Sequence, residues 1–302
     1  MLPWFDQIFL QLSARIEQRK LHHAMLFQGP AGLGKSQFVM GLAQRLLCSE
    51  PQTNMACGVC QSCRLNASGT HPDLHQVESD KQIGVDAIRE SIKKLVGSAH
   101  MSGAKVLIIH HADTMTESSA NALLKTLEEP TDSTFLLLTT SRPERILPTI
   151  KSRCEKHTLP MPDLATCIKW VENQYKGEID PNFARLFSAR PLALLEELQQ
   201  EQKFTFAVFK QGLMDLKTGS KNAAQLGTEW QEFADKVIKW SQYWLREQAT
   251  LSSNKASVDL LFRINKQASI VANQMSNPGI NRALQLVTLL NGIAQVNKVN
   301  SF

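Results

Sequence analysis

The sequence lacks the features that mark membrane-spanning and secreted chains. None of its apolar runs approaches the roughly 18 residues that a membrane helix needs. Its first residues, Met1 to Asp6, do not form a signal peptide, and internal repeats and low-complexity tracts are absent. We therefore expect a cytoplasmic protein that has no membrane partner.

The composition is that of an ordinary globular chain. Of its 302 residues, 43% are hydrophobic and 20% are charged, which is enough for a sizeable core. This length indicates about two or three domains. The net charge is +5, with a mild basic excess in the last third of the chain. Such a bias permits contact with nucleic acid but does not demonstrate it.

The most specific signal is a glycine-rich stretch near the N-terminus. Residues 29–36 read Gly-Pro-Ala-Gly-Leu-Gly-Lys-Ser, a complete phosphate loop. Its glycines let backbone amides face phosphate oxygens, its lysine reaches the β- and γ-phosphates, and its serine can hold Mg²⁺. An apolar strand at 24–27 and a helical pattern at 35–47 flank it, so a helix N-terminus faces the phosphates. The predicted nucleotide-binding residues of this stretch are Gly29, Gly32, Gly34, Lys35 and Ser36.

The usual partner of this loop is missing. An ATP hydrolase of this class also needs an apolar strand that ends in acidic residues, to hold Mg²⁺ and to activate water. The candidate strand, 105–109, ends in His110 and His111, with Asp113 two residues further on. Imidazole is a poor ligand for Mg²⁺, and zinc binding by both histidines is disfavoured because adjacent strand residues point to opposite faces. The sequence therefore predicts nucleotide binding with poor hydrolysis.

Four cysteines follow the phosphate-loop helix with the spacing C-x8-C-x2-C-x2-C. In a reducing compartment such a cluster indicates a metal site rather than disulfides. Four thiolates suit a closed, tetrahedral structural zinc site, which leaves no open position for catalysis. Four free cysteines are the alternative. The predicted zinc ligands are Cys48, Cys57, Cys60 and Cys63.

Strand and helix patterns alternate through the first half, which predicts a parallel sheet with helices on both faces. The pattern stops at Pro160-Met161-Pro162, and only helical periodicity follows from Leu164 onward. Three tryptophans near the C-terminus, at 230, 240 and 244, are expected in a helical core. Besides 24–27 and 105–109, the predicted strands are 73–77 and 134–139. The predicted helices include 35–47, 85–98 and 118–129.

Four motifs occur in the order found in one family. They are the cysteine insert after the phosphate-loop helix, Gly-Thr-His-Pro-Asp at 69–73, Ala-Asn-Ala-Leu-Leu-Lys-Thr-Leu-Glu-Glu-Pro at 120–130, and Ser-Arg-Cys at 152–154. Together they resemble the bacterial sliding-clamp loader family of AAA+ proteins. Within that family the resemblance is greatest to the stator type of subunit, which is often described as non-hydrolysing. It is strong over about residues 1–160, whereas the helical remainder matches mainly in size and layout.

The resemblance implies an AAA+ α/β fold in three parts. It implies a nucleotide-binding domain at 1–160 with the zinc insert at 48–63, a small helical lid at 161–205, and an all-α collar at 206–302 for oligomerisation. The implied partners are the motor and delta subunits of the loader, the sliding clamp, and primer–template DNA. In this family, ATP binding opens the clamp and hydrolysis releases it on DNA.

The resemblance also implies roles for single residues. Arg153, in the Ser-Arg-Cys motif, matches an arginine that enters the ATP site of a neighbouring motor subunit. Thr140 matches the family's sensor threonine. A surface arginine and an ordinary strand-end threonine are the respective alternatives. The lid arginine that contacts the γ-phosphate in motor subunits aligns with Leu192, although Arg190 is near.

Two function classes follow. The favoured function is a stator subunit of the DNA polymerase III clamp loader, with little or no intrinsic ATPase activity. The alternative is a self-sufficient AAA+ ATPase, such as a motor subunit or a helicase-loader relative. His110 and His111 argue against it, as does the absence of a long Pro- or Lys-rich C-terminal extension. An adenylate-type kinase has little support, because no arginine-rich lid is visible.

Overall fold

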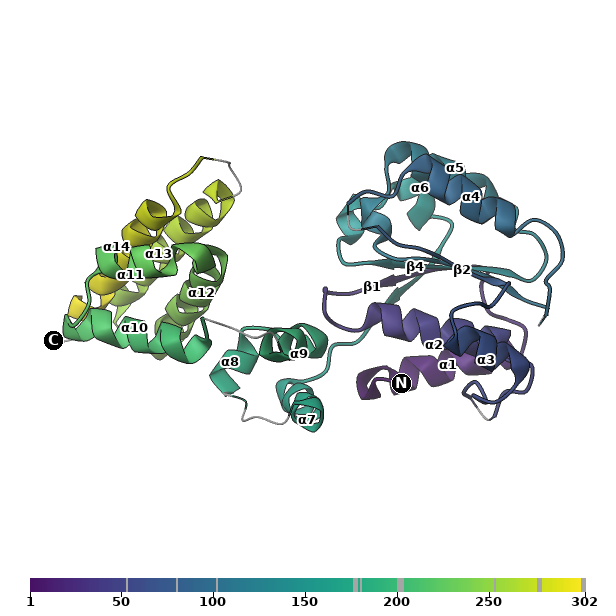
Figure 1. Ribbon diagram of the computed structural model, residues 1–302, viewed down its shortest axis with the longest axis horizontal. Coiled ribbons are helices and arrows are strands. Elements are labelled where there is room, and N and C mark those ends of the chain that lie inside the picture. Colours follow the sequence, from purple (N-terminus) through teal and green to yellow (C-terminus); the bar gives the residue numbers. More distant parts are fainter. Residues whose placement is uncertain are drawn as a thin grey trace. The chain divides into compact units, whose positions relative to one another are not determined.

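The computed structural model describes residues 1–52, 54–79, 81–101, 103–175, 179, 181–199, 204–252, 254–275 and 279–299. The chain divides into two compact units, Met1–Gln199 and Gln200–Phe302 (Figure 1). The three-part division inferred from the sequence is finer than these two units and stays a prediction.

A five-stranded parallel sheet forms the centre of the first unit, in the order β2-β3-β4-β1-β5. The predicted strands are all found, and the most deeply buried of them read as continuous apolar runs, as expected for a sheet covered on both faces. The fifth strand, β5, was not predicted. Strand bounds are β1 Ala24–Gln28, β2 Leu74–Val77, β3 Lys105–Ile109, β4 Thr134–Thr140 and β5 Glu155–Thr158.

Helices cover both faces of this sheet, with α1 to α3 on one side and α4 to α6 on the other (Figure 1). Side chains alternate along β1: Met25 and Phe27 enter the core beneath α1 and α2, whereas Ala24 and Leu26 enter the core beneath α4 and α5. Helix bounds are α1 Asp6–Glu17, α2 Lys35–Leu47, α3 Gln61–Ala67, α4 Val85–Lys94, α5 Glu117–Glu128 and α6 Pro148–Lys151.

Two predicted helices have different ends in the structure. Helix α4 stops at Lys94 instead of reaching residue 98. Gly97 has a φ of +96°, and a right-handed helix cannot continue through such a residue. Helix α5 begins at Glu117 because the Thr116 hydroxyl accepts a hydrogen bond from the N–H of Ser119.

The remainder of the first unit is helical, as the sequence predicts. Helix α7 (Leu164–Gln174) begins after Asp163, whose carboxylate accepts a hydrogen bond from the N–H of Thr166 at 2.7 Å. Helices α8 (Pro181–Arg185) and α9 (Pro191–Gln199) follow, and α9 packs against α7.

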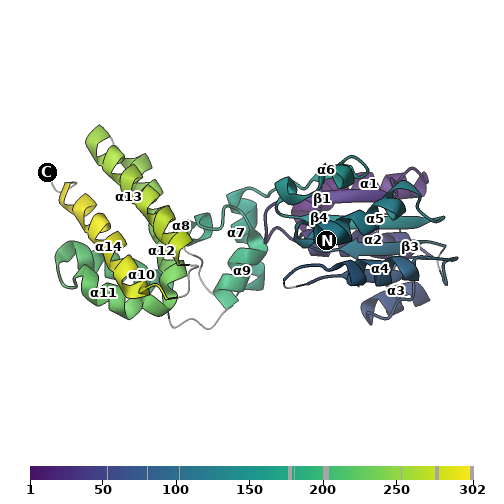
Figure 2. The same cartoon turned by 90° about the horizontal axis from the view of Figure 1, so that it is seen from above.

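The second unit contains only helices among its described residues. Trp230 and Trp240 are buried in its core, as expected, whereas Trp244 is half-buried. Helix α12 packs against α13, and α11 against α14 (Figure 2). Among the described residues of both units, no helix is long and apolar enough to cross a bilayer. Helix bounds are α10 Phe206–Thr218, α11 Ala223–Trp230, α12 Ala234–Leu251, α13 Lys255–Gln274 and α14 Arg282–Val299.

Candidate functional site

The phosphate loop joins the end of β1 to the start of α2, in the strand–loop–helix order that the sequence predicts. Gly32 and Gly34 have φ values of +76° and +99°, in the left-handed region that favours glycine. Gly34 is also the N-cap of α2 and makes no side-chain cap. The first N–H groups of α2 are therefore left to a ligand or to water, at the positive end of the helix dipole.

Lys35 lies folded back onto its own loop. Its side chain is buried, and Nζ donates hydrogen bonds to the carbonyl oxygens of Gly29 at 2.8 Å and Pro30 at 2.9 Å. Burial lowers the pKa of Lys35 to about 8, although the charge of Asp113 opposes this shift. A bound phosphate would replace the two carbonyls as the partner of this ammonium.

The start of α9 covers the phosphate loop. The N–H of Leu192 donates to the carbonyl of Gly32 at 3.1 Å, and a Cβ added to Gly32 would lie 2.5 Å from the Cβ of Ala193. The Nε–H of Arg190 donates instead to the carbonyl of Phe187 at 2.7 Å. Leu192 and Ala193 of α9 therefore contact this loop, whereas the Arg190 side chain is bound elsewhere. Leu192 is the residue that the family resemblance aligns with the lid arginine of motor subunits.

Beyond the loop, β3 ends in two histidines with different surroundings. His110 is buried, and its Nε2–H donates one hydrogen bond to Oε1 of Gln76 at 3.1 Å. Its Nδ1 is buried without a partner in the described part of the chain, and burial lowers the pKa of its imidazole. His111 is half-buried and has a φ of +50°. Neither residue supplies a carboxylate near Ser36.

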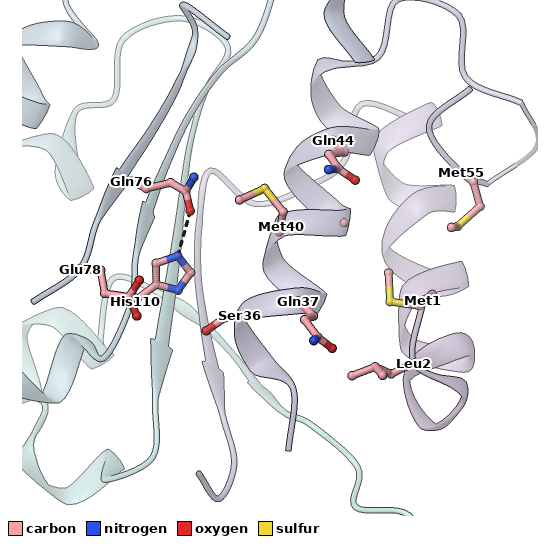
Figure 3. A pocket seen from close by; sticks show the side chains of 11 residues that line it. Met1, Leu2, Ser36, Gln37, Met40, Gln44, Met55, Gln76, Glu78 and His110 are labelled. Carbon is pink, nitrogen blue, oxygen red and sulfur yellow. Dashed lines mark hydrogen bonds between the residues drawn. The ribbon is translucent and has the colours of Figure 1, made fainter. Parts of the chain in front are cut away.

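His110 and Ser36 line one pocket of about 590 Å³ beside the N-terminus of α2 (Figure 3). A neutral imidazole on this wall offers nitrogen, whereas the metal of a nucleotide prefers oxygen. Ser36 is thus the residue of the pair that fits such a metal. The further lining residues are Met1, Leu2, Gln37, Met40, Gly41, Gln44, Met55, Gln76 and Glu78.

A buried carboxylate lies next to Thr140. Oδ1 of Asp113 accepts hydrogen bonds from the Thr140 hydroxyl at 2.7 Å and from the N–H of Ser141 at 3.3 Å. Oδ2 lies 3.5 Å from Nε of Arg142. Sequence reasoning noted Asp113 but gave it no role. The signal was its place just beyond β3, because the carboxyl ends of parallel strands meet at one edge of a sheet.

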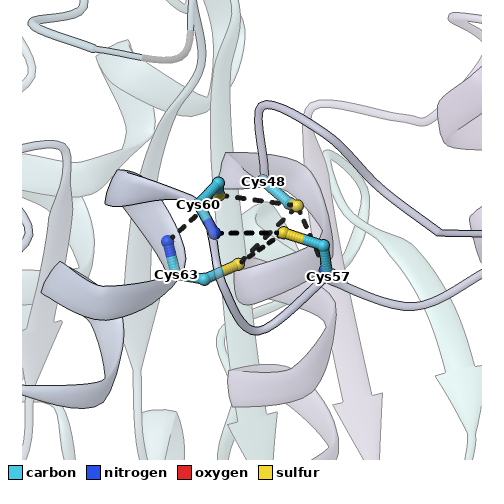
Figure 4. Close-up of side chains that lie close together, drawn as sticks. All are labelled: Cys48, Cys57, Cys60 and Cys63. Atoms are coloured by element: carbon cyan, nitrogen blue, oxygen red, sulfur yellow. Dashed lines mark hydrogen bonds between the residues drawn. The ribbon is translucent and has the colours of Figure 1, made fainter.

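The four predicted zinc ligands lie together where α2 ends and α3 begins (Figure 4). Their sulfur atoms are all within 4.8 Å of one another. The Cys48–Cys60 and Cys57–Cys63 separations are 3.9 Å, and the Cys48–Cys63 separation is 3.6 Å. A tetrahedral zinc with bonds of about 2.3 Å sets its sulfurs about 3.8 Å apart. The cluster therefore has the size and ligand type of a four-thiolate zinc site.

The surroundings of these sulfurs also suit thiolates. Three of them accept backbone N–H groups at 3.3–3.4 Å, in an overlapping series along the loop and α3. Hydrogen bonding from Ser49 lowers the pKa of Cys60 to about 5, whereas burial raises the pKa of Cys63 to about 12 and also raises that of Cys48. A cation bound between them would deprotonate the raised pair.

The Gly-Thr-His-Pro-Asp stretch fastens this insert to the sheet. The Ser62 hydroxyl donates to the carbonyl of Leu47 at 2.5 Å, so it accepts from Nε2 of the buried His71 at 2.7 Å. Nδ1 of His71 accepts from the N–H of Asp73 at 3.1 Å, which fixes the tautomer. This second member of the motif thereby orients α3, on which Cys63 lies.

Arg153 lies in the turn between α6 and β5. Strand β5 is parallel to its neighbour β1, and Arg153 precedes β5 whereas the phosphate loop follows β1, so the two lie at opposite ends of these strands. Its Nε donates to Oε1 of Glu128 at 2.8 Å, and Nη2 donates to the same oxygen. Nη1 donates to the carbonyl of Thr149 at 2.9 Å. The Arg153 side chain is one-third exposed. The pairing with Glu128, at the end of α5, was not predicted from the sequence.

The family model for "DNA polymerase III, delta subunit" matches residues 5–163, more than half of the chain. The chain belongs to this family. The resemblance to clamp-loader proteins, inferred from the four motifs, is thereby confirmed.

Curated relatives of this family member are named "DNA polymerase III subunit delta'". The protein of Pseudomonas aeruginosa is 40% identical over 65% of this chain and 56% of its own length. That of Escherichia coli is 39% identical over 65% of this chain and 60% of its own length. That of Bacillus subtilis is 37% identical over 64% and 57%, respectively. The chain thus matches less than two thirds of the length of these relatives.

A solved structure extends the similarity in fold to both units. The DNA polymerase III gamma subunit-related protein of Thermotoga maritima aligns with 96% of this family member and 99% of its own chain, with a TM-score of 0.54 and 18% identity. This likeness supports the expected AAA+ α/β fold followed by helical parts.

Proposed function

We propose that this chain is a delta-prime-type stator subunit of a bacterial clamp loader. In this role it binds a nucleotide without efficient turnover and helps the loader to place the sliding clamp on primed DNA. The observation that carries the proposal is the combination of a complete phosphate loop with a buried histidine, His110, at the strand end where a hydrolase needs a carboxylate.

The nucleotide would lie on the phosphate loop. Its phosphates would meet the amides at the start of α2 and the ammonium of Lys35, and Ser36 would be the protein ligand of any accompanying Mg²⁺. Thr140 would face the γ-phosphate side, but its hydroxyl is already bound to Asp113. Both ATP and ADP fit this proposal, because neither the loop nor Leu192 contributes a group dedicated to the γ-phosphate.

Zinc is the second proposed ligand, held by the four clustered cysteines in a structural role. The sulfur separations of 3.6–3.9 Å support it. With all four positions taken by thiolates, the metal would contribute stability to the insert rather than chemistry.

Arg153 is the proposed contribution of this subunit to catalysis. Its guanidinium would enter the ATP site of a neighbouring motor subunit and stabilise charge that develops on the transferred phosphoryl group. Its position in a surface turn supports this role, because an arginine that acts on another subunit must be reachable from outside.

The proposed partners are the motor and delta subunits, the sliding clamp and primer–template DNA. The helical second unit would supply the contacts that join the subunits. A subunit that acts on the bacterial chromosome would be located in the cytoplasm.

Two measurements test the proposal together. The purified chain should copurify with the motor and delta subunits, and the assembled complex should show DNA-stimulated ATPase activity and clamp loading that depend on this chain. The isolated chain should bind nucleotide, lose that binding in Lys35→Ala, and turn ATP over at background rate. Strong hydrolysis by the isolated chain, abolished in Lys35→Ala, would favour a self-sufficient ATPase.

That alternative has one observation in its favour. The carboxylate of Asp113 is near enough to Lys35 to influence its pKa, so an acid does exist close to the phosphate loop. However, both of its oxygens are already engaged by Thr140, Ser141 and Arg142. If Asp113 served as the missing catalytic carboxylate, Asp113→Asn would abolish hydrolysis by the isolated chain.

A further inference from the structure

The arginine proposed to act in trans is held by a carboxylate of its own chain. Oε1 of Glu128 accepts both Nε–H and Nη2–H of Arg153, so the side edge of the guanidinium faces the end of α5. On the other side, Nη1 donates to the carbonyl of Thr149 at 2.9 Å, in α6. The plane of the guanidinium is therefore fixed from two elements.

The hydrogen bonds leave part of the guanidinium available to a ligand. Arginine has five N–H donors. In the described structure, two go to Glu128, one goes to Thr149, and a longer bond of 3.3 Å joins Nη1 to the Ser152 hydroxyl. One N–H of Nη2 has no partner among the described residues, and the Ser152 bond is the easiest to exchange. The free N–H of Nη2 lies on the end of the guanidinium that is opposite Cδ, because the other N–H of Nη2 shares Glu128 with Nε–H.

We propose that Glu128 is a positioning residue for Arg153: it holds the guanidinium so that the free end projects toward a phosphate of the neighbouring subunit. This inference rests on the proposed function, and adds to it a residue that acts through the arginine rather than on the nucleotide. Glu128 is half exposed, and Arg153 is one-third exposed.

The physical reason is conformational entropy. A long, exposed arginine side chain occupies many rotamers, and ordering it in one of them costs conformational entropy. When Glu128 and Thr149 hold it beforehand, less of this cost falls on the step in which the phosphoryl group is transferred. Because the pair lies at the surface, its contribution is modest, and we expect it to change the rate by about twofold to fivefold.

The test compares Glu128→Gln with Glu129→Gln in the reconstituted loader. Glu129 is the adjacent exposed acid, and no hydrogen bond or ion pair engages its side chain in the described structure. We expect Glu128→Gln to lower the maximal DNA-stimulated ATPase rate about twofold to fivefold. The KM for ATP should not change, because the arginine stabilises charge that develops only in the transition state. Glu129→Gln should match the wild type.

A double-mutant cycle separates positioning from folding or assembly. In the Arg153→Ala background, Glu128→Gln should have no further effect, because nothing is left to position. An unchanged or higher rate for Glu128→Gln in the wild-type background would overturn the inference, as would an equal loss in both backgrounds. If Arg153→Ala itself leaves the rate unchanged, it is the proposed role of the arginine that fails.

Discussion

The buried lysine of the phosphate loop should make nucleotide affinity depend on pH. Burial lowers the pKa of Lys35 to about 8, and the charged ammonium is the form that attracts phosphate. A phosphate beside the amine favours that charged form. Above pH 8, nucleotide binding must therefore be accompanied by proton uptake, and affinity must fall as the pH rises.

The magnitude follows from the fraction of Lys35 that is charged before binding. With a pKa of about 8, about three quarters of the molecules carry the charge at pH 7.5 and about one tenth at pH 9. The Kd for ADP should then rise about eightfold across this interval, or about 1.2 kcal/mol in binding free energy. Nucleotide phosphates titrate at about pH 6, so they contribute little over the same range.

Isothermal titration calorimetry with ADP, from pH 7.5 to pH 9, measures this slope. Repeating each titration in two buffers of different ionisation enthalpy gives the number of protons taken up. Lys35→Arg is the matched control, because a guanidinium stays charged throughout and should remove the slope. A constant Kd with no proton uptake in the wild type would refute the reasoning, and so would an equal slope in Lys35→Arg.

Three further predictions concern metal, catalysis and stability. Protein purified without added metal should contain close to one zinc per chain by elemental analysis, and Cys60→Ser should lower both the zinc content and the melting temperature; metal-free, fully folded protein would contradict the site. Arg153→Ala should leave assembly intact and lower the DNA-stimulated ATPase rate of the loader. The loss should be about 10³-fold to 10⁵-fold at one ATP site, so the complex keeps part of its activity. Unchanged ATPase and clamp-loading rates would leave this chain with a purely structural role. Gly32→Ala should destabilise the first unit by about 1–3 kcal/mol, because φ is +76° and the new Cβ would lie 2.5 Å from that of Ala193; an unchanged melting curve would contradict the close contact of α9 with the loop.

Local patterns were enough to predict the parts of the site that come from one stretch of chain. The phosphate loop needs only its glycines, its lysine and the flanking apolar strand, all within residues 24–47. The cysteine cluster likewise comes from a short insert whose spacing already brings four sulfurs within reach of one metal ion. Because the residues of such a site lie close together in the sequence, the site can be predicted before the fold is known.

Contacts between distant stretches could not be predicted in this way. Strand β5 was missed because Glu155-Lys156-His157-Thr158 is polar and does not resemble a buried strand, although it pairs with β1 along its whole length. The bond between Asp113 and Thr140 and the pairing of Arg153 with Glu128 both depend on how parallel strands and their helices are stacked. Apart from the place of Asp113 just beyond β3, the sequence offers only the chemical types of these residues as a signal for such pairs.

The polar character of β5 has a consequence for how copies of this protein behave when crowded. As the last strand of the sheet, β5 has one side whose backbone groups are not paired in the sheet, and such edges invite pairing with other chains. Here the edge strand carries charged side chains. Nη1 and Nη2 of Arg15, in α1, donate hydrogen bonds to Oε1 and Oε2 of Glu155 at 2.5 and 2.7 Å. These charged side chains disfavour pairing of β5 with strands of other copies, and so disfavour aggregation. A neighbour that approaches along this edge therefore has to recognise its charged side chains rather than only add a strand to the sheet.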